Sequence, residues 1–250
     1  MSPTGKILRK LWFAFWRFIT RYLYERREYT VYLPFGYRVF TPWFWKELVL
    51  GISKLDQGSL SGRQVVSPDR AYVLYYFCKH SLNLPGDMAE CGVYRGTTAY
   101  LLSLAMSERP HDKKLHLFDT FAGMPDVAIL HRDSHSSGDF ADTSLAFVKE
   151  RLQRFPFVEY HAGMIPETFK EVSSVQVYSF VHIDVVNYTT ALECCKWFWP
   201  QLCSGGSIVF DDYGFYAYRH SVRAAVDEFF ADCQEAPLAL HSGQAVVIKP

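Results

Sequence analysis

AECGVYRGTTAY, residues 89–100, stands between an apolar run and a helix-like run. Gly92 and Gly96 allow the positive φ angles and the close backbone approach of a tight strand–helix turn, and the helix after Gly96 would point free N–H groups at a ligand. The dinucleotide fingerprint G-x-G-x-x-G is absent, and Glu90 would repel a pyrophosphate but could hold an ammonium group. The pattern favours a smaller, non-phosphate ligand, although a purely structural turn fits the same residues.

Strand and helix patterns alternate outward from this turn. Expected strands span residues 87–91, 114–119, 157–162, 177–184 and 206–212, with a closing pair at 238–243 and 244–249. Expected helices span residues 67–82, 96–108, 141–155, 188–202 and 219–232, with a short helical piece at 165–172. Asp142, Thr143 or Ser144 is available to cap the third helix. The alternation predicts an α/β fold with a mostly parallel sheet, helices on both faces and an antiparallel terminal hairpin.

Polar residues follow the expected strands at the edge where ligands of parallel sheets bind. These residues are Glu90, Asp119, His161, Asp184 and the pair Asp211–Asp212. An acid at the position of Asp119 can accept hydrogen bonds from both hydroxyls of a ribose. Together with the glycine turn, this acid indicates a nucleoside that carries an amino acid, such as S-adenosylmethionine. A cap for the following loop is the alternative role of Asp119.

Three carboxylates meet at the ends of two further strands. Asp184 ends one strand, and Asp211 and Asp212 end the next. Neighbouring parallel strands lie about 4.8 Å apart, so these acids can converge, and a hard divalent cation would relieve their repulsion. All-oxygen ligation favours Mg²⁺ over zinc. The alternative is that one acid caps a helix and another pairs with Arg219 or Arg223.

The composition is that of an ordinary globular protein. The 250 residues include 26 basic and 26 acidic side chains and are 49% hydrophobic, so the charge gives no indication of a nucleic-acid partner. Six cysteines are present without a C-x-x-C pair, as expected for buried thiols of a reduced, cytoplasmic protein.

The amino-terminal residues 1–66 are expected to form a helical and aromatic extension ahead of the main domain at 67–250. Residues 6–24 mix basic and aromatic side chains, but the longest uncharged run, residues 11–16, is far shorter than the ~20 residues of a membrane span. This segment is either a helix lying on the inner membrane surface or a helix packed on its own domain or on a second copy of the chain. A homodimer or higher homo-oligomer is therefore expected.

Six separated motifs resemble the macrocin O-methyltransferase family in sequence and order. They are AECGVYRGTTA, LFDTFAGMP, GDFADTS, FVHIDV, GGSIVFDDYG and VRAAVDEF, within residues 66–249. The resemblance implies a Rossmann-like class I fold and a metal-dependent transfer of the methyl group of S-adenosylmethionine to a sugar hydroxyl. It implies cofactor binding by Glu90, Gly92, Tyr94, Gly96, Asp119, Thr120, Phe121 and Asp142. It also implies Mg²⁺ binding by Asp184, Asp211 and Asp212, and a loop over the site at residues 131–144.

One departure concerns the acceptor side of the site. Where the family commonly has H-I-D-V-D-L-Y, residues 182–188 place Val186 and Asn187 at the fifth and sixth positions. The macrolide-sugar acceptor of the family is therefore not carried over as the expected acceptor of this chain.

The catalytic residues expected from the sequence are Asp184, as a ligand of the metal that activates the acceptor, and a histidine as general base. His182 lies on the same strand as Asp184, and His220 follows the acidic pair. Asp212 could also act as the base, and His135 and His161 are further candidates.

The sequence thus predicts a sugar O-methyltransferase that acts on a glycan, a glycolipid or a natural product. A catechol-like diol is an alternative acceptor, since it also chelates magnesium. A nicotinamide oxidoreductase is a different class, which the missing glycine fingerprint disfavours. A non-catalytic, methyltransferase-like binding module is the remaining alternative.

Overall fold

The computed structural model describes residues 66–125 and 135–250, together with Phe15. The chain divides into two compact units, Met1–Val39 and Phe40–Pro250, and the fold described below belongs to the second. The predicted amino-terminal extension and its membrane contact through residues 6–24 lie outside the described residues, apart from Phe15 and Val66, and stay predictions. Among the described helices, none is both long enough and apolar enough to cross a membrane.

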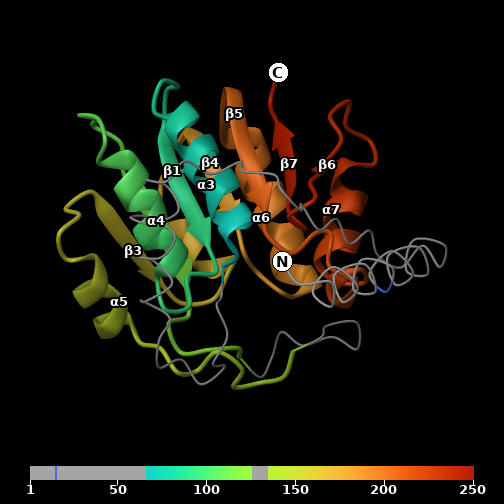
Figure 1. The fold of residues 1–250 in the computed structure, drawn as a ribbon, viewed down its shortest axis with the longest axis horizontal. Coiled ribbons are helices and arrows are strands. Elements are labelled where there is room, and N and C mark those ends of the chain that lie inside the picture. The colour runs from blue at the N-terminus through green and yellow to red at the C-terminus, as the bar shows by residue number, and fades with distance from the viewer. Residues whose placement is uncertain (1–14, 16–65, 126–134) are drawn as a thin grey trace, which may run out of the picture. The chain divides into compact units, whose positions relative to one another are not determined.

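A seven-stranded sheet of order β3-β2-β1-β4-β5-β7-β6 forms the centre of this unit (Figure 1). The strands are β1 (Asp87–Cys91), β2 (Leu115–Asp119), β3 (Val158–Ala162), β4 (Tyr178–Ile183), β5 (Leu202–Phe210), β6 (Leu238–Ala239) and β7 (Ala245–Ile248). Strands β1 to β5 run parallel, and β7 pairs antiparallel with both β5 and β6. The predicted parallel sheet with an antiparallel terminal hairpin is confirmed.

Helices cover both faces of the sheet, as predicted. One buried apolar cluster joins the sheet to α3 (Pro68–Ser81), α4 (Thr97–Met106) and α5 (Leu145–Leu152). The other joins it to α6 (Tyr188–Gln201), α7 (Val222–Phe230) and the 3-10 helix η3 (Glu167–Glu171). Because successive side chains of a strand point to opposite faces, β4 contributes Phe180 to the first cluster and Val181 to the second. All of β4 is buried, which explains its continuous apolar sequence.

Most helix boundaries differ from the sequence prediction by one to four residues, and two of the helices show why. Helix α5 begins at Leu145, because the Ser144 side chain accepts a hydrogen bond from the Phe147 amide at 3.1 Å and caps the helix there. Helix α6 contains Pro200 and ends one residue later, and β5 follows at once from Leu202. The loop before α5 is therefore longer than expected, which leaves residues 135–144 available to border a ligand site.

Phe198 provides a test of how the sheet is held to α6. Its ring is fully buried, with centroids 5.0 Å from Tyr178 and 5.3 Å from Phe169. We expect Phe198→Ala to lower the free energy of unfolding by about 3–5 kcal/mol, because the lost burial leaves a cavity. Urea denaturation measures this loss. Val175→Ala is the control, since Val175 is 83% exposed and should change stability by less than about 0.5 kcal/mol. Equal stability of the two variants would contradict this packing.

Candidate active site

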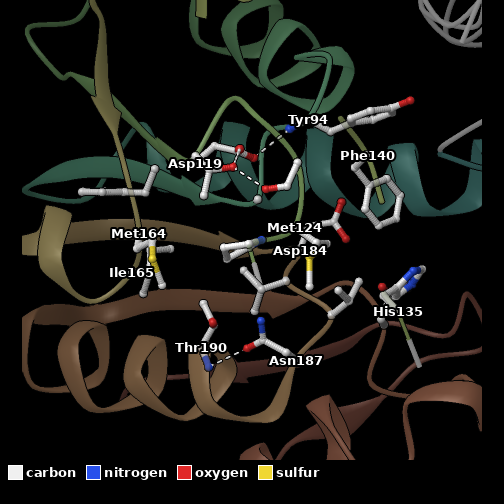
Figure 2. Close-up of a pocket in the computed structure, with 18 of the residues that line it drawn as sticks. Tyr94, Asp119, Met124, His135, Phe140, Met164, Ile165, Asp184, Asn187 and Thr190 are labelled. Atoms are coloured by element: carbon white, nitrogen blue, oxygen red, sulfur yellow. Dashed lines mark hydrogen bonds between the residues drawn. The ribbon is translucent and has the colours of Figure 1, made fainter. Parts of the chain in front are cut away.

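A cavity of about 460 Å³ opens at the carboxyl edge of the parallel strands (Figure 2). Its size is within the range of small-molecule sites. The loops after β1, β2, β3, β4 and β5 all contribute to its wall, and α3 adds Arg70. Figure 2 shows Met164 and Ile165 on one side and His135 and Phe140 on the other, with Asp184 between them. The cavity thus lies where the sequence predicted a ligand site.

The glycine turn after β1 closes tightly against the end of β4. Gly92 has φ +84°, and a Cβ there would overlap the carbonyl oxygen of Asp184. Gly96 has φ +75° and starts α4, where its lack of a side chain makes room for Val148. Gly92 and Tyr94 line the cavity, whereas Gly96 does not. Only glycine at position 92 allows the two strand ends to approach this closely.

Asp119 fastens this turn to the end of β2. Its carboxylate accepts hydrogen bonds from the backbone amides of Val93 (2.6 Å), Tyr94 (2.9 Å) and Phe121 (2.6 Å). The side chain also lines the cavity. A carboxylate offers about four acceptor positions, so these amides leave room for a further donor. Holding the turn was not foreseen from the sequence, and binding of ribose by Asp119 stays a prediction.

Of the other residues predicted to bind the cofactor, Thr120 lines the cavity, whereas Phe121, Asp142 and Glu90 do not. Thr120 lines the cavity and donates to the Gly123 carbonyl oxygen at 2.8 Å. Phe121 is buried with φ +51° and does not line it. Asp142 accepts a hydrogen bond from the Tyr94 hydroxyl at 2.7 Å, so it positions a wall residue. Glu90 is fully buried beneath the turn and does not reach the cavity.

Asp184 and Asp212 bring two carboxylates to the cavity wall. Burial and the neighbouring charge of Asp212 raise the pKa of Asp184 to about 6. Burial also raises the pKa of Asp212, against the opposing charge of Arg70. No described residue donates a hydrogen bond to the Asp184 carboxylate, so its oxygens are available to a ligand.

Asp211, the third predicted metal ligand, lies close to this pair but is bonded to the protein. It is 1% exposed, forms an ion pair with Arg70 and accepts a hydrogen bond from Gln244 at 2.7 Å. Arg70 also lies 3.2 Å from the Asp212 carboxylate. The partner of the acids is therefore Arg70 from α3, and neither Arg219 nor Arg223 fills that role. Ligand atoms of His182, Asp184 and Asp211 all lie within 4.8 Å of one another.

The structure does not bring either histidine proposed as general base, His182 or His220, to the cavity wall. His182 is fully buried, with Nδ1 2.8 Å from Glu90 and Nε2 3.4 Å from Asp211, and it does not line the cavity. A base must come within hydrogen-bond reach of the acceptor, which this position prevents. His220 is exposed at the surface and does not line the cavity either. His161 is also absent from the wall.

His135 is the histidine that the cavity contains. Its Nδ1 lies 3.0 Å from the Asp139 carboxylate, and its Nε2 lies 2.9 Å from the Tyr218 hydroxyl. The Asp139 carboxylate accepts a hydrogen bond, so in the neutral ring Nδ1 of His135 carries the single N–H and donates to Asp139. Nε2 then accepts a hydrogen bond from the Tyr218 hydroxyl, whose pKa burial raises above its ordinary value. The sequence named His135 only as a further candidate, and its partners could not be inferred without the fold.

Arg70 is the main site residue that the sequence analysis missed. It stands in the first turn of α3, where a positive charge opposes the helix dipole. An arginine at such a position indicates an acidic partner elsewhere in the fold, so a signal was present. The neutral Gln244 gave no comparable signal.

The wall combines an apolar part with an acidic part. Phe118, Met124, Pro125, Met164 and Ile165 form apolar surface near the ends of β2 and β3. Asp184 and Asp212 provide negative charge near β4 and β5. Such a division suits a ligand with a flat apolar ring at one end and a positive charge at the other.

Comparison with known proteins agrees with this geometry. The family model Macrocin-O-methyltransferase (TylF) matches residues 79–242. A curated tetracenomycin-rhamnose 4'-O-methyltransferase of Streptomyces olivaceus is 24% identical, over 56% of this chain and 57% of that protein. Mycinamicin III 3''-O-methyltransferase of Micromonospora griseorubida is 23% identical, over 56% of this chain and 59% of that protein. The matched part of this chain therefore spans less than 60% of the length of these two relatives.

Solved structures share the fold. The O-methyltransferase NovP superposes with a TM-score of 0.61 at 21% identity, covering 73% of this chain and 80% of that chain. A methyltransferase of Podospora anserina, solved with S-adenosylhomocysteine, gives a TM-score of 0.58 at 14% identity, covering 82% and 88%. These neighbours confirm the predicted class I methyltransferase fold, and the family match over residues 79–242 shows that the chain belongs to the macrocin O-methyltransferase family.

Proposed function

We propose that this chain is an S-adenosylmethionine- and Mg²⁺-dependent O-methyltransferase that acts on a sugar hydroxyl. The observation that carries the proposal is the position of Asp184, whose carboxylate faces the cavity beside the glycine turn after β1. The names of the curated relatives describe O-methylation, and one of them specifies a rhamnosyl-bearing compound. By analogy, this chain would methylate a sugar hydroxyl of an acceptor of its own.

Residues on one side of the cavity fit the cofactor. Asp119 retains acceptor capacity for one ribose hydroxyl, and the apolar side chains of Phe118, Met164 and Ile165 offer a surface for adenine. Gly92 lines the cavity at the turn and could border the amino-acid part. The acidic end at Asp184 would attract the positive sulfonium.

Residues at the acidic end fit a hard cation. Asp184 and Asp212 are oxygen donors in a cavity, and burial together with the charge of Asp212 raises the pKa of Asp184, which a cation would oppose. Asp211 could join them if it exchanged its contact with Arg70 for the metal. When bound, S-adenosylmethionine supplies an electrophilic methyl group, and Mg²⁺ lowers the pKa of a coordinated hydroxyl.

His135 is the proposed base that takes the proton of the acceptor hydroxyl. An acceptor that displaced the Tyr218 phenol would face the Nε2 lone pair of His135. Asp139 holds the ring in that tautomer and would stabilise the imidazolium after proton transfer. A bound S-adenosylmethionine would supply the methyl group and leave as the neutral thioether, and His135 would take the proton that the acceptor hydroxyl loses. The chain mainly aligns the reacting atoms.

Asp184→Asn tests the metal role. The amide keeps the size of the side chain but removes the charge, so Mg²⁺ affinity and methyl transfer should each fall more than about 100-fold. Binding of S-adenosylhomocysteine, measured by calorimetry in the absence of metal, should stay close to wild type. Asp232→Asn, at an exposed acid outside the cavity, is the matched control. A variant that transferred methyl groups normally would remove Asp184 from the site.

His135→Gln tests the base. Loss of general-base catalysis should lower kcat by about 10²–10⁴-fold, and Mg²⁺ and S-adenosylhomocysteine binding should change little. His220→Gln serves as the control, because that side chain is exposed and outside the cavity. Steady-state kinetics measure both variants. A lower kcat for His220→Gln than for His135→Gln would contradict the assignment of His135 as the base.

An acceptor panel tests the substrate class. The chain is incubated with S-adenosylmethionine, Mg²⁺ and either sugars with neighbouring hydroxyls or catechols, and products are weighed by mass spectrometry. We expect methylated sugars, and we expect EDTA to abolish the reaction. Preference for catechols would favour the alternative acceptor. Binding of S-adenosylhomocysteine without methylation of any diol would favour a non-catalytic binding module.

A further inference from the structure

Two buried histidines form a pair on the sheet face that α6 and η3 cover. His116 lies on β2 and His161 on the edge strand β3, and their side chains are 5% and 8% exposed. His116 Nδ1 and His161 Nε2 are 3.0 Å apart. Neither residue lines the cavity, and the ring of Phe118 stacks on His161 and borders the cavity. The pair is therefore a feature separate from the proposed methyl-transfer site.

The outer nitrogen of each histidine faces a carboxylate. His116 Nε2 lies 3.2 Å from Asp87, and His161 Nδ1 lies 3.0 Å from Glu171. A carboxylate accepts a hydrogen bond, so the proton of each neutral ring belongs on its outer nitrogen. The two inner nitrogens then direct lone pairs at each other across 3.0 Å. Such an arrangement is repulsive unless a cation lies between the rings.

Glu159 completes a set of three donors. Its Oε2 lies 3.6 Å from His116 Nδ1, and its other oxygen, Oε1, accepts from Lys114 at 2.9 Å. The ligand atoms of His116, Glu159 and His161 all lie within 4.8 Å of one another. Zinc bonds of about 2.0–2.1 Å in a tetrahedron place ligand atoms about 3.3 Å apart, close to the 3.0 Å and 3.6 Å that separate His116 Nδ1 from His161 and Glu159.

The outer ring nitrogens of the two histidines have the hydrogen-bond partners that metal-binding histidines usually have. Histidines that bind metals usually donate their other ring N–H to a carboxylate, which fixes the tautomer and the ring orientation. Asp87 and Glu171 occupy these positions, and Gln176 in turn donates to Asp87 at 2.7 Å. Imidazole donors favour zinc over magnesium, in contrast to the carboxylates of the cavity.

We propose that His116, His161 and Glu159 bind a Zn²⁺ ion that fastens the edge strand β3 to β2. Glu159 is partly exposed, with 42% of its side chain accessible, so the ion can enter from solvent and can take water as its fourth ligand. An ion that binds only the folded chain raises its stability by mass action. The site links an edge strand, a central strand and, through Glu171, the short helix η3.

Zinc titration of the 250-residue chain tests the site. Mg²⁺ is kept at a saturating concentration throughout the titration, so that it would occupy the acidic end of the cavity in place of zinc. We expect one zinc ion per chain by calorimetry and a rise of several degrees in Tm when zinc replaces EDTA. His161→Gln should weaken zinc binding at least tenfold, and Glu159→Gln should weaken it and remove most of the Tm shift.

Glu159→Gln keeps the test informative if a buried histidine variant fails to fold, because Glu159 is partly exposed. Glu167→Gln is the matched control, since this exposed acid lies on η3 outside the histidine pair. Zinc affinity unchanged in Glu159→Gln, or reduced equally in Glu167→Gln, would overturn the proposal.

A crystal soaked in zinc locates the ion directly. We expect an anomalous peak about 2.0–2.1 Å from His116 Nδ1, His161 Nε2 and Glu159 Oε2. A peak only at the acidic end of the cavity would overturn the site. So would a Tm that depends on pH in the range of histidine titration but is insensitive to zinc, because a shared proton would then replace the metal.

Discussion

The close approach of Gly92 to the Asp184 carbonyl is the constraint on which the rest of the site depends. β1 and β4 are neighbours in the sheet, and Cys91 pairs with Ile183 at their carboxyl ends. A side chain at position 92 would collide with the β4 backbone, so the turn after β1 would have to move away. The turn would then lose the amide positions that hold Asp119. The conformational freedom of one glycine thus sets the distance between Asp119 and Asp184 on the two sides of the cavity.

The sequence was sufficient for the fold because its signals were local and repeated. Apolar runs such as residues 178–183, and the alternation of strands and helices, require only the neighbouring residues to be interpreted. The positions of Asp119, Asp184 and Asp212 at strand ends followed from the same alternation, because topology brings carboxyl ends of parallel strands to one edge. All three acids line the cavity.

What the sequence could not supply is the set of partners. Asp211 and Asp212 are adjacent in the chain, yet Asp212 faces the cavity and Asp211 is buried against Arg70 and Gln244. These partners come from residues 141 positions before Asp211 and 33 after it. The position of His182 outside the cavity wall has a related cause. The sequence places His182 two residues before Asp184, but the neighbouring strands β1 and β5 enclose its side chain. That burial depends on the order of the strands in the sheet.

Negatively charged carboxylates at and beneath the cavity wall explain why this edge of the sheet should attract cations. A polar chain crosses the sheet from Glu90 through His182 to Asp211, with Nδ1 of the histidine 2.8 Å from Glu90 and Nε2 3.4 Å from Asp211. Asp184 and Asp212 lie next to it. Among the described residues, Arg70 is the arginine or lysine that forms ion pairs with this group.

Arg70 and His182 oppose the negative charge of four carboxylates, and buried charge without full compensation is costly. Burial, together with the charge of Asp212, raises the pKa of Asp184 against these two groups. A divalent metal and a sulfonium would add positive charge without protonation. The negative charge would therefore strengthen the binding of both cationic ligands, and it would favour the sulfonium substrate over its neutral thioether product.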